Sequence, residues 1–489
     1  MQPLKKMPFF LFLLVLFFCL HGWLENYGFI RFTELLLPGL LIFLCVLLLT
    51  GIVYLFTKDL LYASLITFFI SLWYLFFGAL HDGVQSFPFL SFLKSYAAMA
   101  ALLLAATPAW IFFLKKKKRL HQKLVLYLNL LLLIYCLIDI FSLGKKGLAG
   151  STAGATASVG FDTARVAQKP DVYLLVFDEY PGFESLTDSF AFANKGMRDY
   201  LAANDFEVLP VFSNYDLTYF SMSSILNMQY IKDDFENLRL TQKDFQKRGV
   251  EINHAAVIPL FRSMGYAIEN LSVFDLDDQP ALSVDNPFLL AHTTLLTDKM
   301  FHNRLQRDLG RHLQKTIPFW NNNSFYQHDA DNKQVEELLL RSVQQKKAGP
   351  AFVYAHFMMP HGPYYYDSLG NKNAFEKIAD YTRWKDKALF VSYLRYINNR
   401  VYKMADTITR RNPGAVVILM GDHGYRSFDN PNPAIAARYN NLCAVRMPGK
   451  KQLSFKEQWS TVNLFRSLFN NGFGQNIPYL PDSTVVLAF

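Results

Sequence analysis

Five long apolar segments before residue 145 limit what this chain can fold into more than any other feature. They lie at about 8–23, 32–56, 60–80, 95–114 and 124–143. A helix needs about 20 apolar residues to cross the hydrocarbon of a bilayer. The first segment follows Lys5 and Lys6 as a signal peptide would, but no small-residue cleavage pattern follows it and four more segments do. The sequence therefore predicts a five-helix transmembrane domain over residues 1–144.

The positive charges between these segments predict the orientation of the domain, because lysine and arginine stay on the cytoplasmic side of short loops. With the N-terminus inside, the outer loops before the fourth segment carry only Arg31 and Lys94. The cytoplasmic parts carry Lys5, Lys6, Lys58, Lys115 to Lys118, Arg119 and Lys123. An odd number of spans then places everything after residue 144 outside the cytoplasm.

The net charge of +9 does not indicate that the protein binds nucleic acid. The run KKKKRLHQK lies between two of the apolar segments, where it is explained as an orientation signal and a contact for anionic lipid headgroups. We therefore expect no nucleic-acid partner.

The residues after the fifth segment divide into a linker and a globular domain. Residues 145–168 are mostly small and lack an apolar period, which predicts a flexible linker. From residue 169 to 489, short β-rich runs (DVYLLVF, AIENLSVF, AFVYAHF and AVVILMG) alternate with helical patterns, among them 456–471. Such alternation predicts an α/β domain with a mostly parallel sheet and helices on both faces, whose ligands bind beyond the carboxyl ends of the strands.

Polar residues follow three of these four predicted strands. DVYLLVF leads into Asp178, AFVYAHF carries His356 and leads to His361, and AVVILMG delivers Asp422 and His423. Taken alone, each could be a turn residue, a helix cap or a buried core histidine. Together at one edge of one sheet, they favour a metal site of carboxylate and imidazole ligands.

A nucleophile is available in the stretch NYDLTYFSMSS. Thr218 lies where a helix is expected to begin, next to free backbone N–H groups and the positive end of the helix dipole. This position suits a hydroxyl that attacks phosphorus. Ser221 and Ser224 are more simply explained as small polar residues that allow close helix packing.

These residues resemble those of the alkaline phosphatase superfamily, in particular its membrane-anchored sulfatase-like transferases such as lipoteichoic acid synthases and phosphoethanolamine transferases. Their plan is similar: five spans, a linker and an outer α/β domain. The resemblance implies a metal site of Asp178, Thr218, Asp422 and His423, with Thr218 as nucleophile. It places His361, in PHGPYYYD, near the transferred group or a second metal.

Three differences from the family pattern restrict which members of the family this chain resembles most. The chain has no histidine after His423, and Cys443 is the only cysteine of the outer domain, so no disulfide can form within it. Both favour a single-metal site like that of lipoteichoic acid synthases. The C/S-x-P-x-R context of true sulfatases is absent around Thr218 and Cys443, so sulfate-ester hydrolysis is not expected.

The resemblance implies a bacterial cytoplasmic-membrane enzyme with one divalent ion, Zn²⁺ or Mn²⁺. In the mechanism that we expect, Thr218 displaces diacylglycerol from a membrane phospholipid, and the phosphoglycerol or phosphoethanolamine group passes to an envelope glycan or lipid. His361, and less directly His356, would protonate a leaving oxygen or orient the phosphate. The same residues would serve a membrane-anchored phosphodiesterase or phosphatase, and a non-catalytic envelope binding protein is a third alternative. Arg383, Arg426 and Arg438 lie where they could contact phosphate or simply be solvated.

Overall fold

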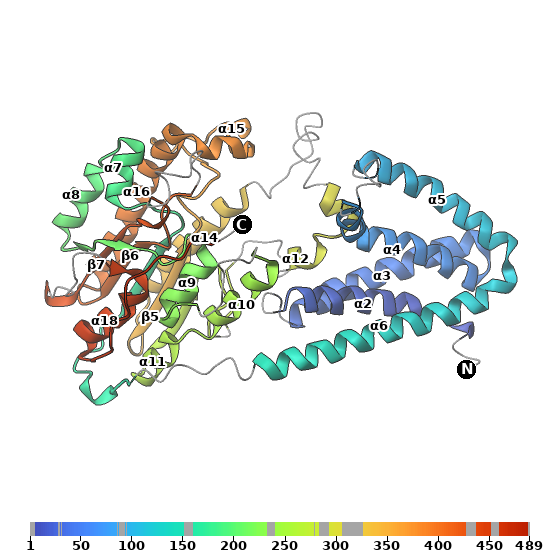
Figure 1. Cartoon of the computed structure of the whole chain (residues 1–489), viewed down its shortest axis with the longest axis horizontal. Coiled ribbons are helices and arrows are strands. Elements are labelled where there is room, and N and C mark those ends of the chain that lie inside the picture. The colour runs from blue at the N-terminus through green and yellow to red at the C-terminus, as the bar shows by residue number, and fades with distance from the viewer. Residues whose placement is uncertain are drawn as a thin grey trace. The chain divides into compact units, whose positions relative to one another are not determined.

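The computed structural model spans residues 1–489 and divides into two compact units (Figure 1). The first unit comprises Met1–Ala153 and Asp285–Asn322, and the second comprises Gly154–Val284 and Asn323–Phe489. The structure describes all residues except 1–4, 28–29, 31, 86, 88–92, 94, 151–159, 232–239, 278, 283–292, 306–325, 427–436, 451–458 and 488–489.

Helices occupy the positions of all five predicted spans in the first unit. They are α2 (Phe10–Glu25), α3 (Phe32–Thr57), α4 (Leu60–Gln85), α5 (Tyr96–Lys116) and α6 (His121–Gly150). Within the described residues, three helices are long and apolar enough to cross a membrane, at Phe32–Thr57, Leu60–Val84 and Lys118–Lys146. These apolar helices form a membrane anchor, whereas the number of five spans stays a prediction.

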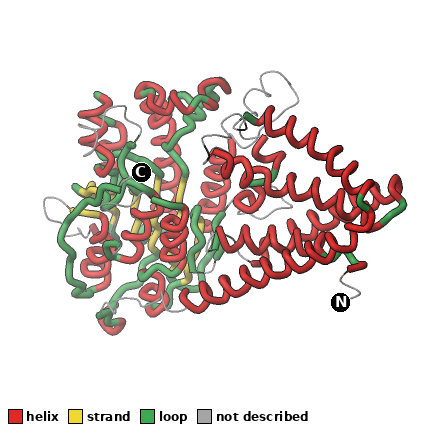
Figure 2. The backbone as a smooth tube through the Cα atoms, turned by 45° about the vertical axis from the view of Figure 1, so that its right-hand side comes forward, coloured by secondary structure: helices red, strands yellow, loops and turns green. Residues whose placement is uncertain are grey.

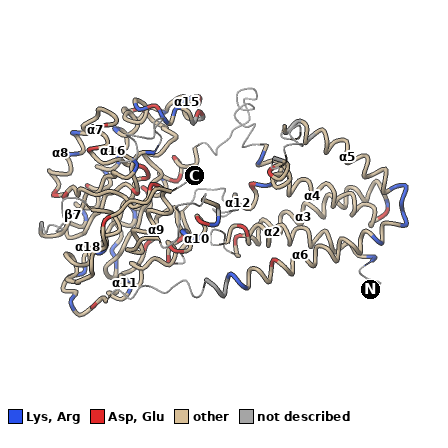
Figure 3. Tube along the Cα trace, in the orientation of Figure 1, with Lys and Arg blue, Asp and Glu red and all other residues tan. Residues whose placement is uncertain are grey.

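The basic residues of the first unit gather at the turn between α5 and α6, where Figure 3 shows a patch of blue. Lys115 and Lys116 end α5, and the short 3-10 helix η2 (Lys118–Leu120) continues the run. Cations at a helix C-terminus face the negative end of its dipole, so they also stabilise the end of α5.

The predicted linker begins later than expected, because α6 continues to Gly150. Residues 145–150 are therefore helical, which corrects the prediction that the linker starts at residue 145. Lys146 donates a hydrogen bond from Nζ to the carbonyl oxygen of Leu24, 2.7 Å away, which fixes this end of α6 against α2. Residues 151–159 lie outside the described part of the chain.

The second unit is built on a six-stranded sheet of order β2-β7-β6-β1-β5-β4. The strands β1, β4, β5 and β6 are parallel to their neighbours within this group, whereas β7 runs antiparallel to β6 and to β2. A second sheet pairs β3 with β8. The bounds are β1 (Val172–Phe177), β2 (Glu207–Val208), β3 (Val211–Phe212), β4 (Ala267–Leu271), β5 (Ala351–Phe357), β6 (Val416–Gly421), β7 (Cys443–Arg446) and β8 (Trp459–Ser460).

Helices cover both faces of the sheet, and Figure 2 shows the strands in yellow between them. Successive residues of β1 point into two different cores: Val172, Leu174 and Val176 into one, and Tyr173, Leu175 and Phe177 into the other. The first core is shared with α9 (Thr218–Asn227), α10 (Gln242–Asn253), α11 (Val257–Ser263) and α18 (Leu464–Phe473). The second is shared with α7 (Phe183–Phe190), α8 (Lys195–Ala203), α14 (Gln327–Gln344), α15 (Phe375–Ala379) and α16 (Lys387–Arg411).

The predicted fold class is therefore confirmed, and the four predicted strands form β1, β4, β5 and β6. The helix predicted over 456–471 begins only at Leu464, because Trp459 and Ser460 pair with β3 instead. Pairing buries the Trp459 side chain in the first core, which a surface helix would not do.

Candidate active site

Asp178 is fixed at the carboxyl end of the central strand β1. Its backbone N–H donates to the carbonyl oxygen of Phe357 on the neighbouring strand at 2.9 Å, and its own carbonyl accepts from the N–H of His361 at 3.1 Å. Both bonds tie Asp178 to the end of β5. The Asp178 side chain is buried, so its position depends on the sheet and not on a mobile surface loop.

Asp422 and His423 lie directly after β6, on the other side of β1. Asp422 Oδ1 accepts from the N–H groups of Glu179 and His423, both at 2.9 Å. The flanking glycines are required by space: a Cβ on Gly421 would lie 2.3 Å from the carbonyl oxygen of Tyr180, and one on Gly424 would lie 2.0 Å from that of Ala437. Because these backbone segments approach so closely, the loop can turn both side chains toward Asp178.

The tautomer of His423 follows from its hydrogen bonds. Its Nδ1 lies 2.7 Å from the carbonyl oxygen of Gly424, so Nδ1 carries the proton and Nε2 carries the lone pair in the neutral ring. Nε2 lies 3.3 Å from Asp422 Oδ2, 3.9 Å from Asp178 Oδ1 and 3.3 Å from the Thr218 hydroxyl. The lone pair therefore faces the same small space as both carboxylates.

Thr218 is the first residue of α9, as the sequence predicts for a nucleophile at a helix N-terminus. Its hydroxyl lies 3.4 Å from Asp178 Oδ2 and 3.3 Å from His423 Nε2. The nearby Ser221 hydroxyl donates to the carbonyl oxygen of Asp422 at 2.6 Å, which ties α9 to the loop after β6. Ser224 bonds only within its own turn, to the carbonyl oxygen of Gln229. The two serines therefore have structural contacts, and Thr218 alone of the three touches the acidic centre.

His356 lies in the same centre as these residues. From the sequence we expected this histidine to protonate a leaving oxygen or to orient the phosphate. The ring is fully buried, and its Nδ1 lies 2.8 Å from the Tyr354 hydroxyl. One ligand atom each from Asp178, His356 and Asp422 lie within 4.8 Å of one another. This geometry adds His356 to the residues that could hold a metal ion.

Three buried atoms at this centre have no hydrogen-bond partner among the described residues: Asp178 Oδ1, Asp422 Oδ2 and His356 Nε2. Unpaired buried acceptors are rare in folded proteins and call for an ion or another partner. Two carboxylate oxygens and an imidazole nitrogen suit Zn²⁺ or Mn²⁺. The residues present therefore fit a divalent metal ion.

The electrostatics of the centre agree with this fit. Burial raises the pKa of Asp178 to about 6, and the nearby charge of Asp422 adds to the increase. Burial also opposes ionisation of Asp422, but the His423 and His356 rings outweigh it and hold the pKa of Asp422 below its usual value. Burial lowers the pKa of His356 to about 4, so this ring is neutral at pH 7 and can act as a ligand. A cation would remove the repulsion between the carboxylates.

His361 lies in the loop after β5 and is only partly buried. Its Nδ1 is 2.6 Å from the carbonyl oxygen of Gly362, which again leaves Nε2 as the lone-pair nitrogen of the neutral ring. The ring packs edge-on against Trp384, with 5.8 Å between centroids. Positive charge on His361 lowers the pKa of Asp178, so the ring lies within electrostatic reach of the centre without being part of the buried ligand cluster.

Sequence reasoning missed His328, at the start of α14. Burial lowers the pKa of His328 to about 4, and the His361 ring adds to the decrease, so the two histidines lie within electrostatic reach of each other. The polar surroundings of His328, YQHDADN, give no signal of this position.

The three arginines named from the sequence have different environments. The N–H of Arg426 donates to Glu179 Oε1 at 2.6 Å, and its charge lowers the pKa of Asp178, which places it at the centre. Arg438 donates to Asp216 Oδ2 at 3.3 Å. Arg383 is exposed and lies 3.9 Å from Asp380.

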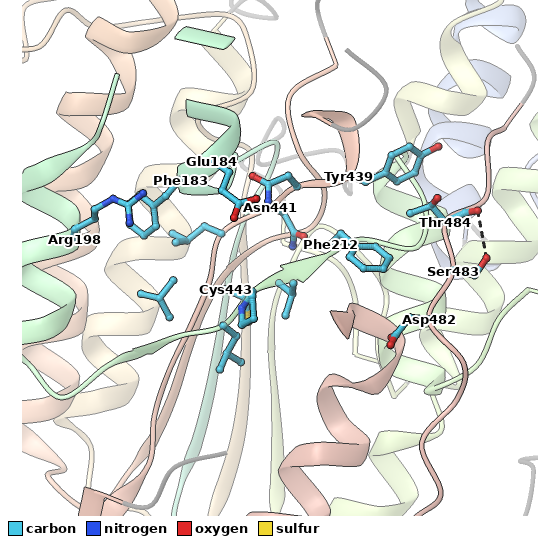
Figure 4. A pocket seen from close by; sticks show the side chains of 17 residues that line it. Phe183, Glu184, Arg198, Phe212, Tyr439, Asn441, Cys443, Asp482, Ser483 and Thr484 are labelled. Atoms are coloured by element: carbon cyan, nitrogen blue, oxygen red, sulfur yellow. Dashed lines mark hydrogen bonds between the residues drawn. The ribbon is translucent and has the colours of Figure 1, made fainter. Parts of the chain in front are cut away.

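A separate cleft of about 790 Å³ lies in the same unit, and none of the predicted site residues lines it. Its walls come from the start of α7, from β3, from the loop before β7 and from residues 482–484. Figure 4 shows Arg198 and Phe183 at one end of this cleft and Ser483 and Thr484 at the other.

Comparison with known proteins identifies the family. The sulfatase family model matches residues 211–468, which is more than half of the chain. The chain belongs to the sulfatase family. The matched region contains Thr218, His356, His361, Asp422 and His423, while Asp178 lies upstream of it, directly after β1. The predicted resemblance to sulfatase-like proteins of the alkaline phosphatase superfamily is thus confirmed.

Solved structures with a similar arrangement share little sequence with this chain. The C-terminal periplasmic domain of EcEptC from Escherichia coli, in complex with Zn, is 13% identical; the match covers 64% of this chain and 85% of that chain with a TM-score of 0.40. A phosphonate monoester hydrolase from Silicibacter pomeroyi is 12% identical over 65% and 75%, with a TM-score of 0.39. That of Agrobacterium radiobacter is 14% identical over 65% and 76%, with a TM-score of 0.37. No curated protein sequence matches the chain.

Proposed function

We propose that this protein transfers a phospholipid-derived headgroup, phosphoglycerol or phosphoethanolamine, to a glycan or lipid of the bacterial cell envelope. The observation that carries the proposal is the position of the Thr218 hydroxyl, at a helix N-terminus and within 3.4 Å of both Asp178 and His423. A threonine in this environment can form a phosphodiester-linked intermediate. A purely structural threonine would not need a buried carboxylate and an imidazole beside its hydroxyl.

Each residue of the site has a role in the first half of the reaction. Thr218 Oγ1 attacks phosphorus, and its proton passes to Asp178, whose Oδ2 lies 3.4 Å away. The bond from phosphorus to the diacylglycerol oxygen breaks, and His361 supplies the proton that this oxygen needs. Backbone N–H groups of the first turn of α9 face the developing negative charge.

The second half reverses these roles. A hydroxyl of the acceptor attacks phosphorus, its proton passes to His361, and the bond to Thr218 breaks, which frees the threonine. A divalent ion, Zn²⁺ or Mn²⁺, held by Asp178, Asp422, His423 and His356 with Thr218 beside them, would supply Lewis-acid stabilisation of the phosphoryl oxygens. Arg426 adds positive charge at the rim of the site.

The membrane anchor supports a lipid donor. A phospholipid stays in the bilayer during the reaction, so an anchored enzyme meets it directly whereas a soluble enzyme would have to extract it. We place the α/β unit outside the cytoplasm, since the positive charges favour that orientation.

The test uses the full-length protein in vesicles that contain headgroup-labelled phosphatidylglycerol or phosphatidylethanolamine, with Zn²⁺ or Mn²⁺, with and without a glycolipid acceptor. We expect acceptor-dependent release of diacylglycerol and labelling of the acceptor, lost in Thr218→Ala and kept in Ser224→Ala, whose hydroxyl bonds only to Gln229. Free headgroup phosphate without acceptor labelling would establish a hydrolase. No release by metal-loaded protein would favour the non-catalytic alternative.

A further inference from the structure

Residues 293–305, which we name the docking segment, are part of the first unit although their chain neighbours belong to the second. The chain leaves the second unit after Val284 and returns to it at Asn323. Between these points the described residues form α12 (Thr293–Thr297), a turn at 298–300 and a helical stretch at 301–305, and α12 lies beside α2 and α3 (Figure 1). The sequence interpretation placed all of 169–489 in one outer domain, so this excursion is an addition to that prediction.

The docking segment is bound to α4 by a cluster of charges. Asp82 Oδ2, in the last turn of α4, accepts hydrogen bonds from Lys299 Nζ at 2.7 Å and from Arg304 Nη2 at 2.6 Å. The Arg304 side chain is only 8% exposed. Such charge-assisted bonds in a partly buried position are among the stronger polar contacts in proteins.

Main-chain contact at Gly78 makes the docking specific. The N–H of Gly78 lies 2.7 Å from the carbonyl oxygen of Lys299. A Cβ at Gly78 would lie 2.8 Å from Lys299 Cα and 2.7 Å from Arg304 Nε, so only glycine permits this approach. By contrast, a Cβ at Gly83 of the same helix would meet no atom within 4 Å.

Apolar contacts complete the attachment. Leu296 and Met300 are buried in the core of the helical unit. The Phe301 ring lies edge-on to Phe77 with 4.9 Å between centroids, and His302 Nδ1 lies 2.8 Å from the Tyr74 hydroxyl. A surface loop that touched the helices by chance would not combine buried apolar side chains, shared charges and a glycine contact.

The stretch of chain between the second unit and the docking segment is short. Nine residue steps separate Val284 from Thr293, and an extended chain spans at most about 3.6 Å per residue, so these two points stay within about 32 Å of each other. Val284 follows β4, which pairs with β5, the strand that carries His356. The docking segment is therefore joined, through a short stretch of chain, to the part of the second unit that contains this sheet.

We propose that the docking segment ties the chain of the α/β unit to the helical unit through its attachment to α4, and that this attachment is needed for turnover of a phospholipid in a bilayer but not of a small water-soluble phosphodiester. This inference rests on the proposed function, because it specifies how the same site reaches a membrane-bound donor. It makes the end of α4 an interaction surface for the protein's own inserted segment.

The test compares full-length Gly78→Ala with Gly83→Ala, a matched change on the same helix. The first readout is tryptic cleavage after Lys299 and Arg304, which the docked segment should resist. The second is activity on labelled phospholipid in vesicles and on bis(p-nitrophenyl) phosphate in solution. Asp82→Asn, which removes the shared charge without adding an atom to the contact, is the second variant should Gly78→Ala fail to fold.

We expect Gly78→Ala and Asp82→Asn to be cleaved faster within the docking segment and to lose at least about tenfold in phospholipid turnover, a difference of about 1.4 kcal/mol, with soluble-substrate activity within twofold of wild type. Gly83→Ala should match wild type in all three readouts. Unchanged phospholipid turnover in a variant whose segment is cleaved, or an equal loss on both substrates, would overturn this inference alone. Wild-type protein that leaves phospholipid untouched would instead refute the proposed function.

Discussion

Replacing Asp178 by asparagine should stabilise the metal-free protein at pH 8, although Asp178 is central to the site. Asp178 is buried next to a second carboxylate, and its pKa is raised from 3.8 to about 6. Ionising it in the folded protein therefore costs about 3 kcal/mol more than in the unfolded chain, at about 1.4 kcal/mol for each pKa unit. Asparagine has nearly the same shape and avoids this cost.

The pH dependence follows from the sign of the shift. Because the folded protein holds this proton more tightly than the unfolded chain, the cost is absent below about pH 4, grows between about pH 4 and pH 6, and is constant above that. The gain from Asp178→Asn should follow the same course. At pH 8 it should raise the melting temperature by about 6 °C, since 1 kcal/mol corresponds to roughly 2 °C in a domain of this size.

The assay is thermal unfolding of the full-length protein in detergent with a chelator, followed by tryptophan fluorescence at pH 4.5 and pH 8. The control is Asp188→Asn, an exposed carboxylate on α7, which should leave the melting temperature unchanged. Added Zn²⁺ should stabilise wild type and not Asp178→Asn, so that their order reverses. A lower melting temperature for metal-free Asp178→Asn at pH 8 would show that the buried charge of Asp178 does not destabilise the metal-free protein.

Three further predictions concern the loops around the site. Gly424→Ala, whose Cβ would lie 2.0 Å from the carbonyl oxygen of Ala437, should lower the unfolding free energy by at least about 2 kcal/mol in chemical denaturation, whereas Gly414→Ala, with its nearest contact at 3.8 Å, should not. Ser221→Ala removes the 2.6 Å bond to the Asp422 carbonyl and should cost about 1 kcal/mol in the same assay, and an unchanged value would show that this bond does not hold the loop. Zn²⁺ affinity, measured by calorimetry, should fall about tenfold between pH 8 and pH 5 because Asp178 must lose its proton, and a flat profile would contradict the raised pKa.

The sequence was sufficient to predict the central sheet because β1, β5 and β6 are buried on both faces and read as nearly continuous apolar runs, whereas β4 is only partly buried and was predicted from a short β-rich run. Strand β7 was not predicted, since CAVR spans only four residues and is defined by pairing with β6. The same holds for Trp459, whose local pattern suits a helix but whose side chain is buried by pairing with β3. The local sequence pattern therefore identified the parallel strands, whereas pairing between segments far apart in the sequence decided β7 and the strand at Trp459.

The candidate site also contains residues that the local sequence predicts and features that depend on long-range contacts. Asp178, Asp422 and His423 were predictable because parallel strands end at one edge of the sheet. The structure adds the tautomer of His423 and the unpartnered nitrogen of His356, which depend on contacts between residues far apart in the sequence. His328 comes from a helix whose position beside the site no local pattern reveals.

Intact-mass analysis shows directly whether Thr218 becomes covalently linked to a headgroup phosphate. Full-length protein is incubated with Zn²⁺ or Mn²⁺ and short-chain phosphatidylglycerol or phosphatidylethanolamine, quenched in acid and weighed beside Thr218→Ala. We expect an added mass of one phosphoglycerol or phosphoethanolamine group on the wild type, located on the peptide that contains Thr218 and absent from the variant. Metal-loaded wild type that consumes phospholipid without any such adduct, or an adduct that persists in Thr218→Ala, would contradict this expectation.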